Sequence, residues 1–281
     1  MMLLISVLVA VVLILGLGAV APNLPYNHLL GGTFYQIVAI LLAIIISAVL
    51  NMPMLNMMRA NSAYNKGRNK DALALYKKAY KSKFLSPDMV IFCGYIFLKE
   101  GNPALAEEAF DRVLGKKLNN RQKNSLDTNK AILFWKKGDI DSAISLLEEV
   151  WEREPSITVA GTLGALMLVK ARQTGDYSCA LDFCEQTNNQ YTYEKTILAN
   201  LGEAYYSTNQ NEKALKTFEE LMDCGSTAPA AYYYYALALL KAERMDEAEE
   251  MLNRSLRQRF SALSTVSKKT VREKLNQITV E

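Results

Sequence analysis

Histidine is almost absent from this sequence: its 281 residues contain one, His28, which lies in the first fifth of the chain. Ser-His-Asp and Cys-His catalytic sites, and metal motifs such as HExxH, all need histidine beside their other members. The charged region after residue 58 has no histidine, so it cannot contain these sites. This excludes much of the common hydrolase chemistry. We expect no catalytic residue and a protein that is not an enzyme.

Motifs for cofactors and metals are missing as well. The sequence has no GxxxxGK[ST] loop for a phosphate, and none of its four cysteines forms a CxxC pair: Cys93, Cys179, Cys184 and Cys224. Cys93 and Cys184 occupy core positions of the helical repeats described below, which favours reduced, buried thiols over zinc or redox chemistry. We therefore predict no cofactor and no metal site.

Charged side chains are missing from residues 1–58, so all 61 Asp, Glu, Lys and Arg residues lie after that point. Two apolar runs, 3–21 and 34–52, are each close to the roughly 20 residues that a helix needs to cross a bilayer. The loop between them holds four residues that end helices and turn the chain: Pro22, Pro25, Gly31 and Gly32. The sequence predicts a transmembrane helical hairpin over residues 1–53.

The distribution of basic residues predicts the orientation of this hairpin. The connecting loop has no Lys or Arg, whereas four follow the second span within about 20 residues: Arg59, Lys66, Arg68 and Lys70. Because positive charge marks the cytoplasmic side, we expect the loop outside and the charged region in the cytosol. An alternative treats residues 1–21 as a signal peptide, since AVA at 19–21 resembles a cleavage site. No basic residue precedes the apolar core and Pro22 would follow the cut, which favours a retained span.

A pattern recurs in the charged region, in which an alanine is followed four residues later by an aromatic residue, a leucine or, once, a cysteine. The alanines are 34, 37, 37, 34 and 34 residues apart: Ala72, Ala106, Ala143, Ala180, Ala214 and Ala248. A turn signal stands five residues before each alanine, and in the first four copies it is glycine. Apolar residues on both sides have helical spacing. Each unit is therefore predicted to be a helix, a turn and a second helix.

The fifth copy is the clearest, with six residues in pattern: Leu198, Leu201, Gly202, Tyr205, Ala214 and Phe218. They resemble the tetratricopeptide repeat, whose pattern is Trp-x2-Leu-Gly-x2-Tyr followed by Ala, Phe and Pro. Six copies in near-constant phase cover residues 54–260. The resemblance implies an all-α fold: a right-handed α-solenoid of about six helix-turn-helix repeats, closed by a capping helix over residues 261–281.

Small residues at the helix crossings, and two departures from the pattern, lead to further expectations. Gly202 and Ala214 should face each other where the helices of one unit cross, so the glycine serves packing and not ligand binding. The first copy has Arg59 in place of a leucine and begins at Pro53, which leaves open whether it is a full repeat. In the fourth copy the Leu-Gly pair stands sixteen instead of twelve residues before the alanine. This predicts a first helix that is longer by one turn.

The family's concave surface comes mainly from the first helix of each unit, so the resemblance implies a partner-binding groove. Carrying over the family's inner positions gives nine candidate residues: Ile91, Tyr95, Leu98, Ile132, Trp135, Glu203, Tyr206, Tyr233 and Leu237. This surface is apolar and aromatic, which suits a helix or an extended apolar peptide. The alternative is that the same side chains pack against neighbouring repeats or the capping helix.

These features predict a membrane-anchored cytosolic scaffold that acts as an adaptor or assembly factor for a membrane-associated complex. Its expected partners are a protein or peptide ligand and, through two transmembrane helices, the lipid bilayer. The basic residues near the C-terminus are more simply a solvated helix face than a nucleic-acid site, since the overall charge is nearly balanced. The alternative from another class is a regulatory subunit or degenerate enzyme of cell-envelope biogenesis.

Overall fold

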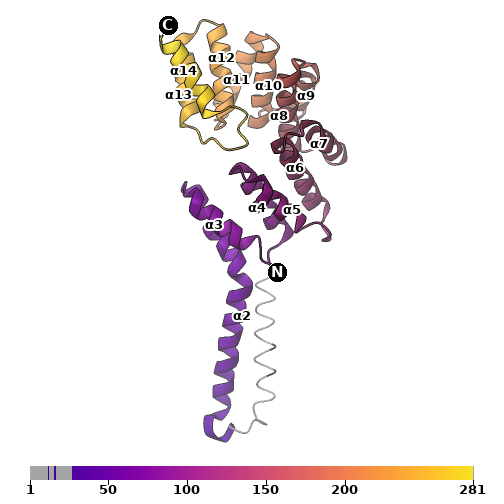
Figure 1. Ribbon diagram of the computed structural model, residues 1–281, viewed down its shortest axis with the longest axis vertical. Coiled ribbons are helices and arrows are strands. Elements are labelled where there is room, and N and C mark those ends of the chain that lie inside the picture. The colour runs from indigo at the N-terminus through magenta and orange to yellow at the C-terminus, as the bar shows by residue number, and fades with distance from the viewer. Residues whose placement is uncertain (1–11, 13–15, 17–26, 281) are drawn as a thin grey trace. The chain divides into compact units, whose positions relative to one another are not determined.

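The computed structural model describes residues 12, 16 and 27–280, and every regular element in these ranges is a helix (Figure 1). This confirms the all-α prediction for the described residues. The chain forms two compact units, residues 1–93 and 94–281. The helices are α2 (Asn27–Asn65), α3 (Asn69–Ala79), α4 (Pro87–Lys99), α5 (Pro103–Asp111), α6 (Asn120–Lys136), α7 (Ile140–Arg153), α8 (Ile157–Thr174), α9 (Ser178–Gln190), α10 (Lys195–Ser207), α11 (Asn211–Asp223), α12 (Pro229–Lys241), α13 (Met245–Arg257) and α14 (Lys268–Val280).

In the first unit, the last turns of α2 form the first helix of the first repeat. They pack against α3 and bury Met57, Ala60 and Ala63. Ala60 and Ala72 are fully buried and take the places that glycine and alanine have in the fifth copy. Arg59, the residue that leaves the first copy in doubt, is exposed. The first repeat is therefore complete.

α2 is continuous across Pro53, where the sequence predicts the end of the hairpin. The helix begins at Asn27, earlier than the predicted span at 34–52, and continues through the proline. A proline removes one backbone hydrogen bond, but packing of the following turns against α3 keeps the chain helical. Ile40–Asn65, with a mean hydropathy of 2.1, is the one segment of the described residues long and apolar enough to cross a membrane. The other predicted span, 3–21, lies outside the described residues except at two positions, so one candidate span is described where the sequence predicts two.

In the second unit, first and second helices of the repeats alternate along the chain. α6 contacts α7, α8 contacts α9, α10 contacts α11 and α12 contacts α13, which confirms the predicted helix pairs. α8 has 18 residues against 13 in α10, so the longer first helix predicted for the fourth repeat is confirmed. α6, with 17 residues, is longer as well, which the spacing did not predict.

Glycines at the helix crossings pack against aromatic rings. A Cβ atom at Gly202 would lie 2.6 Å from the Phe218 ring, and one at Gly94 would overlap the Phe110 ring. Such a distance is shorter than van der Waals contact, so a side chain at either place would force the helices apart. Gly202 therefore serves packing, as predicted. Its immediate neighbour is Phe218, one turn beyond the predicted Ala214, which is itself fully buried.

The turn inside each of the six repeats holds a residue with a positive φ angle. Glycine takes this place in the first four, whereas Asn209 (φ 61°) and Glu243 (φ 60°) take it in the last two. In five of these turns the next N–H donates to the carbonyl five residues back, as Arg244 does to Leu239 at 3.0 Å. This is the longer bond of the Schellman motif that ends many helices. The turn geometry is thus kept where glycine is lost.

Replacement of Glu243 by glycine is expected to stabilise the protein by about 0.5 to 1 kcal/mol. The left-handed conformation is unfavourable for a residue with a Cβ atom, while the greater flexibility of glycine in the unfolded chain offsets part of the gain. Thermal melts of the purified protein in detergent measure the change. Gly138→Ala, at a matched turn where the new Cβ would contact nothing, should lower the midpoint. A lower midpoint for Glu243→Gly as well would contradict strain at this turn.

α14 closes the C-terminal end of the second unit. It packs against α13, and Val271 is fully buried in the contact. Leu275 and Ile278 pack on the same core cluster. Apolar residues of α14 therefore face the repeats, as a capping helix requires.

This helix begins later than the predicted segment, which starts at residue 261. Its first residue is Lys268, and the Ser267 hydroxyl accepts a hydrogen bond from the Thr270 N–H at 3.0 Å. A serine at this place satisfies a backbone donor of the first helical turn and so favours the helix start there. Residues 258–267 form a non-helical connection between α13 and α14, which we call the strap.

Candidate partner-binding surface

The inner layer of the second unit is built from the first helices of its repeats. α6 contacts α8, α8 contacts α10, and α10 contacts α12, so these helices lie side by side in chain order (Figure 1). Each of the second helices α7, α9, α11 and α13 packs onto its own first helix. Matching positions of the first helices therefore share one continuous face, which we call the inner face.

The nine predicted groove residues differ in burial. Five are half-buried: Tyr95, Trp135, Tyr206, Tyr233 and Leu237. Four are buried: Ile91, Leu98, Ile132 and Glu203. A buried side chain offers no free surface, so the half-buried residues are the ones that can contact a partner without rearrangement. Ile91 belongs to the first unit and is not placed relative to the others.

Tyrosines from α10 and α12 form a ring cluster on the inner face. The ring centroids of Tyr206 and Tyr234 are 5.9 Å apart, and those of Tyr233 and Tyr234 are 5.4 Å apart in a T-shaped arrangement. Tyr234 is buried, whereas Tyr206 and Tyr233 are half-buried. Leu237 packs on the same core cluster, and Trp135 packs on a different one with residues of α7 and α8. The structure thus brings together Tyr206, Tyr233 and Leu237, and the Glu203 side chain joins them through Arg172 and Tyr234.

Lysines at the ends of first helices lie over aromatic rings. The Nζ atom of Lys136 is 4.6 Å from the centroid of the Trp135 ring, and that of Lys241 is 4.2 Å from the centroid of the Tyr206 ring. Both distances suit a cation–π contact. Burial also lowers the pKa of Lys136. The inner face therefore combines rings with amines, whereas the sequence predicts an apolar and aromatic surface.

Arg172, which is half-buried, and the buried Glu203 form an ion pair on this face. The Arg172 Nη1 atom donates to the Glu203 carboxylate and, at 3.2 Å, to the Tyr234 hydroxyl, which links α8, α10 and α12. Glu203 is 6% exposed. Burial raises the pKa of Glu203 to about 7, although the Arg172 guanidinium and the Tyr234 hydroxyl act in the opposite direction. In the protein without a partner, the Glu203 side chain therefore links α10 to α8 through Arg172.

Arg172 and Tyr234 are not among the residues predicted for the inner face. Arg172 stands eight residues before the alanine of its repeat, the same count that places Trp135 and Tyr206 before theirs. Extending the inner positions to the fourth repeat would have found it, because the extra turn of α8 precedes this position. The repeat phase does not point to Tyr234, because the inner position in this part of α12 is the preceding residue, Tyr233.

A cavity of 610 Å³ lies between the inner face and the strap. Arg172, Tyr233 and Tyr234 line it from the helices. The strap side is rich in hydroxyl groups, from Ser261, Ser264, Thr265 and Ser267. The volume is within the range of about 300 to 1,000 Å³ that is usual for ligand sites. Phe260 and Val266 also line it, so its walls are mixed and suit a peptide with both polar and apolar groups.

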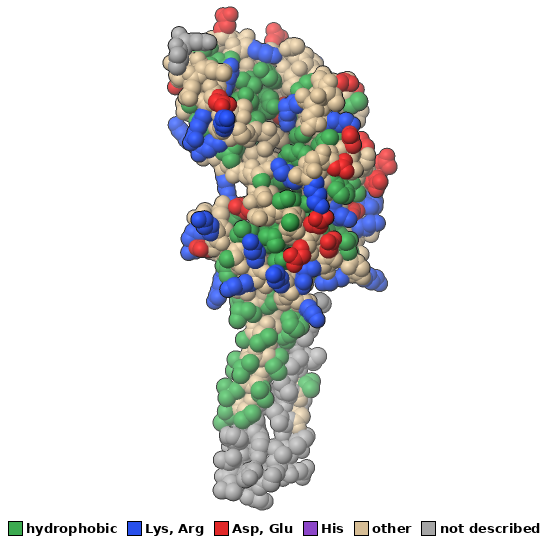
Figure 2. All heavy atoms as spheres, viewed as in Figure 1, with side chains coloured by type: hydrophobic (Ala, Val, Ile, Leu, Met, Phe, Trp, Pro, Cys, Tyr) green, Lys and Arg blue, Asp and Glu red, His purple; other side chains and the backbone are tan. Residues whose placement is uncertain are grey.

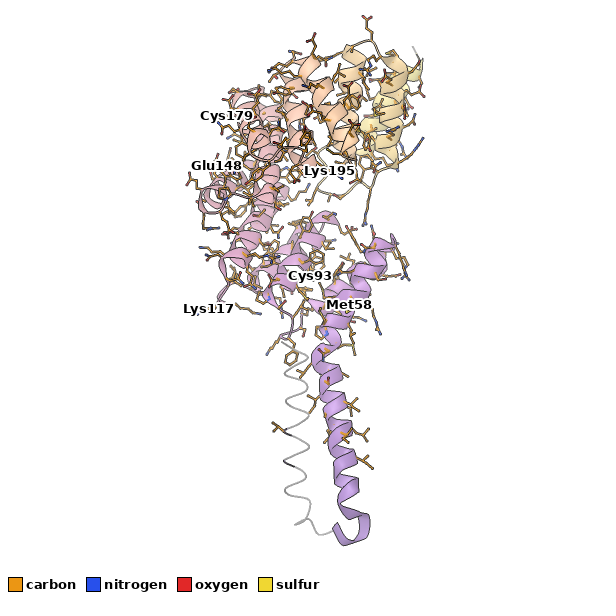
Figure 3. All side chains as sticks on the ribbon, turned by 180° about the vertical axis from the view of Figure 1, so that it is seen from behind. Met58, Cys93, Lys117, Glu148, Cys179 and Lys195 are labelled. Atoms are coloured by element: carbon orange, nitrogen blue, oxygen red, sulfur yellow. The ribbon has the colours of Figure 1, made fainter. Side chains whose placement is uncertain are left out.

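The cysteines are free thiols. Burial raises the pKa of Cys93 and that of Cys184 to about 12, so both stay protonated at neutral pH. This agrees with the predicted core positions. Cys179 is exposed on α9 (Figure 3), and Cys224 is half-buried. Within the described residues, no group of three or more His, Cys, Asp or Glu side chains could hold a metal ion.

Comparison with known sequences points to the repeat family. A sequence model of the tetratricopeptide repeat matches residues 57–120 and 199–261. These segments hold the first two and the last two repeats, and the repeats between them are those with the longer first helices. No curated protein sequence matches the chain.

Solved structures share the fold. A tetratricopeptide repeat protein from Parabacteroides merdae has a TM-score of 0.63 at 12% identity, over 88% of this chain and 93% of that one. A thermophilic repeat protein from Thermus thermophilus has a TM-score of 0.56 at 16% identity, over 70% of this chain and 100% of that one. Identities this low show the fold alone. Together with the matched segments, the shared fold supports a tetratricopeptide repeat protein.

Proposed function

We propose that this protein is a membrane-anchored scaffold whose inner face binds a segment of a partner protein. Repeat solenoids use such extended surfaces for binding. The observation that carries the proposal is the set of half-buried rings on the inner face, Trp135, Tyr206 and Tyr233, which a partner can cover. Aromatic side chains often dominate the binding free energy of an interface. A scaffold of this kind serves as an adaptor or assembly factor for a membrane-associated complex.

The exposed surface of α2 supports the membrane anchor. Of its apolar window 17% is buried, whereas the core helix of a soluble protein is mostly covered. Figure 2 shows hydrophobic side chains along this helix, and the exposed ones include Ile40, Leu41, Ile44, Ile45 and Val49. The Asn51 amide donates to the Ser47 carbonyl at 2.8 Å, so this polar group has a partner within the helix, as a lipid environment requires. We propose that this segment, with the apolar run at 3–21, holds the repeats on the cytosolic side of a membrane.

Cysteine labelling tests the topology. A cysteine at Asn27 should react with a membrane-impermeant maleimide on intact cells, whereas one at Lys116 should react only after lysis. The reason is that the basic residues after the span favour the cytosol for its C-terminal side. The exposed native Cys179 is replaced by serine to keep the background low. Labelling at Lys116 and not at Asn27 on intact cells would overturn the cytosolic assignment.

Truncation of the inner-face rings tests the binding surface. Trp135→Ala or Tyr206→Ala should weaken the partner about 30-fold, or about 2 kcal/mol, if each ring is a binding hot spot. The partner is identified by crosslinking in intact cells, and its affinity is then measured by titration calorimetry. The control is Tyr193→Asn, which removes a 67% exposed ring and suits the φ of 63° at that turn. Normal binding by both inner-face variants, with unchanged melting, would contradict the proposal.

A further inference from the structure

The strap is longer than the connection between its helices requires. α13 and α14 pack against each other, and α10 and α11, which also pack against each other, are joined by three residues, 208–210. The strap has ten residues and forms a long loop that extends away from α13 and α14 (Figure 1). Connections between packed helices usually take about two to eight residues. The extra length carries the chain to the ends of α4 and α6.

Contacts at Ala262 fix the strap on these two helices. The Ala262 N–H donates to the Lys99 carbonyl at 2.9 Å. The Ala262 carbonyl accepts a hydrogen bond from the Lys136 Nζ atom at 2.7 Å. Both backbone polar groups of one strap residue are therefore held by other repeats, and such main-chain hydrogen bonds are also how proteins hold peptide ligands.

Two further contacts involve the strap's side chains. Arg259, three residues before Ala262, forms an ion pair with Glu100 at 3.2 Å. A Cβ atom at Gly101 would lie 3.5 Å from the Ala262 Cβ atom, so this place fits a small residue. We call the surface made by Lys99, Glu100, Gly101 and Lys136 the seat. The seat therefore matches a segment of the form Arg-x-x-Ala in the turn conformation of the strap.

The strap covers the inner face loosely. The 610 Å³ cavity remains beneath it, and residues 260–265 are all half-buried. The Ser264 N–H donates to the Ser261 carbonyl at 3.0 Å, so part of the strap's bonding is internal. Segments with few buried contacts open at a lower free energy than core helices. A ligand that also fills the cavity can therefore displace the strap.

We propose that the seat is a binding site for a peptide of the form Arg-x-x-Ala that turns at its alanine as the strap does, and that the strap occupies it as an intramolecular competitor. The partner segment supplies an arginine for Glu100, a small residue beside Gly101 and larger groups for the cavity. The proposal rests on the proposed function in taking the inner face as the binding surface. It adds the chemistry of the partner. It also adds that the strap leaves the seat before the partner binds, so the apparent affinity is the intrinsic affinity multiplied by the fraction of molecules with an open seat.

A disulfide between strap and seat tests this competition. Gly101→Cys and Ala262→Cys are combined in the full-length protein in detergent, and Cys179 and Cys224 are changed to serine. Gly101→Cys without Ala262→Cys is the control for the strain that a side chain meets at the φ of 76°. The 3.5 Å separation falls within the Cβ–Cβ range of disulfides, about 3.5 to 4.5 Å. The probe is the fluorescein-labelled synthetic peptide QRFSALST, residues 258–265, and anisotropy reports its affinity. The reduced protein should bind it at least tenfold more tightly than the oxidised protein.

A second variant leaves the seat intact. Arg259→Glu removes the strap's ion pair, so it should bind the probe at least tenfold more tightly than the wild type does. A probe with glutamate in place of its arginine should bind this variant at least tenfold more weakly. Equal affinity of oxidised and reduced protein, with the disulfide verified by mass spectrometry, would overturn the proposal, and so would absence of probe binding to Arg259→Glu. The Trp135 and Tyr206 variants are tested with the natural partner, so failure here is distinguishable from failure of the scaffold function.

Discussion

Replacement of Arg172 by methionine is expected to lower the free energy of unfolding by about 1.5 to 3 kcal/mol at pH 8, the usual contribution of hydrogen bonds to a charged group. Methionine keeps much of the apolar stem, so the loss reports mainly on the charge. The substitution leaves the Glu203 carboxylate buried without its guanidinium and removes the link to the Tyr234 hydroxyl. Thermal and denaturant melts of the purified protein measure the change.

The pH dependence is the control for this prediction. The pKa of Glu203 is about 7 in the folded protein against an ordinary value of 4.5, so folding favours the protonated acid. Its contribution to stability is therefore largest below pH 4.5 and is lost as the pH rises through 7. Arg172→Met should recover most of its deficit at pH 5, where the buried acid is neutral, and Glu203→Gln should flatten the profile across this window. Equal deficits at pH 5 and pH 8 would contradict an uncompensated charge.

Leucine in place of Gly202 is expected to lower the free energy of unfolding by about 3 kcal/mol, the upper end of the usual cost of overpacking. Its Cβ atom alone would lie 2.6 Å from the Phe218 ring. That ring is fully buried and stacks on Tyr235 with centroids 5.6 Å apart, so it cannot move without disturbing the next repeat. Thermal melts of the full-length protein in detergent measure the loss.

A second substitution separates overpacking from other effects. Phe218→Ala alone should destabilise the protein by leaving a cavity. In the Gly202→Leu background the same change makes room for the leucine, so the double variant should be more stable than the sum of the two losses predicts. Additive losses would show that the two positions do not compete for space. An unchanged midpoint for Gly202→Leu alone would contradict the assigned repeat register.

The repeat architecture could be predicted because its determinants are local in sequence. The spacing between a small residue on one helix and an alanine on the next sets the phase of each pair, and the sixteen-residue spacing in the fourth copy predicts the longer α8. Asn209 and Glu243 adopt the left-handed conformation that the turn requires although neither is glycine. Position within the repeat therefore determines the turn more strongly than residue type does.

Features that depend on distant residues could not be predicted. Pro53 often ends a helix, and its place inside α2 depends on the packing of later turns against α3. Arg172 and Glu203 are 31 residues apart, and Lys136 and Ala262 are 126 apart, so no local pattern joins either pair. The inner positions can be counted from the repeat phase. The contacts of each side chain, and the strap that covers them, exist only in the folded chain.

Site-specific photo-crosslinking tests most directly whether the inner face is the partner-binding surface. A photoreactive amino acid is placed at Tyr206 on the inner face and, in a separate variant, at Glu148, an exposed position on the second helix α7 (Figure 3). Intact cells are irradiated, and the adducts are identified by mass spectrometry. Binding on the inner face predicts a discrete protein adduct from position 206 and none from position 148. An adduct from position 148 with none from position 206 would contradict it.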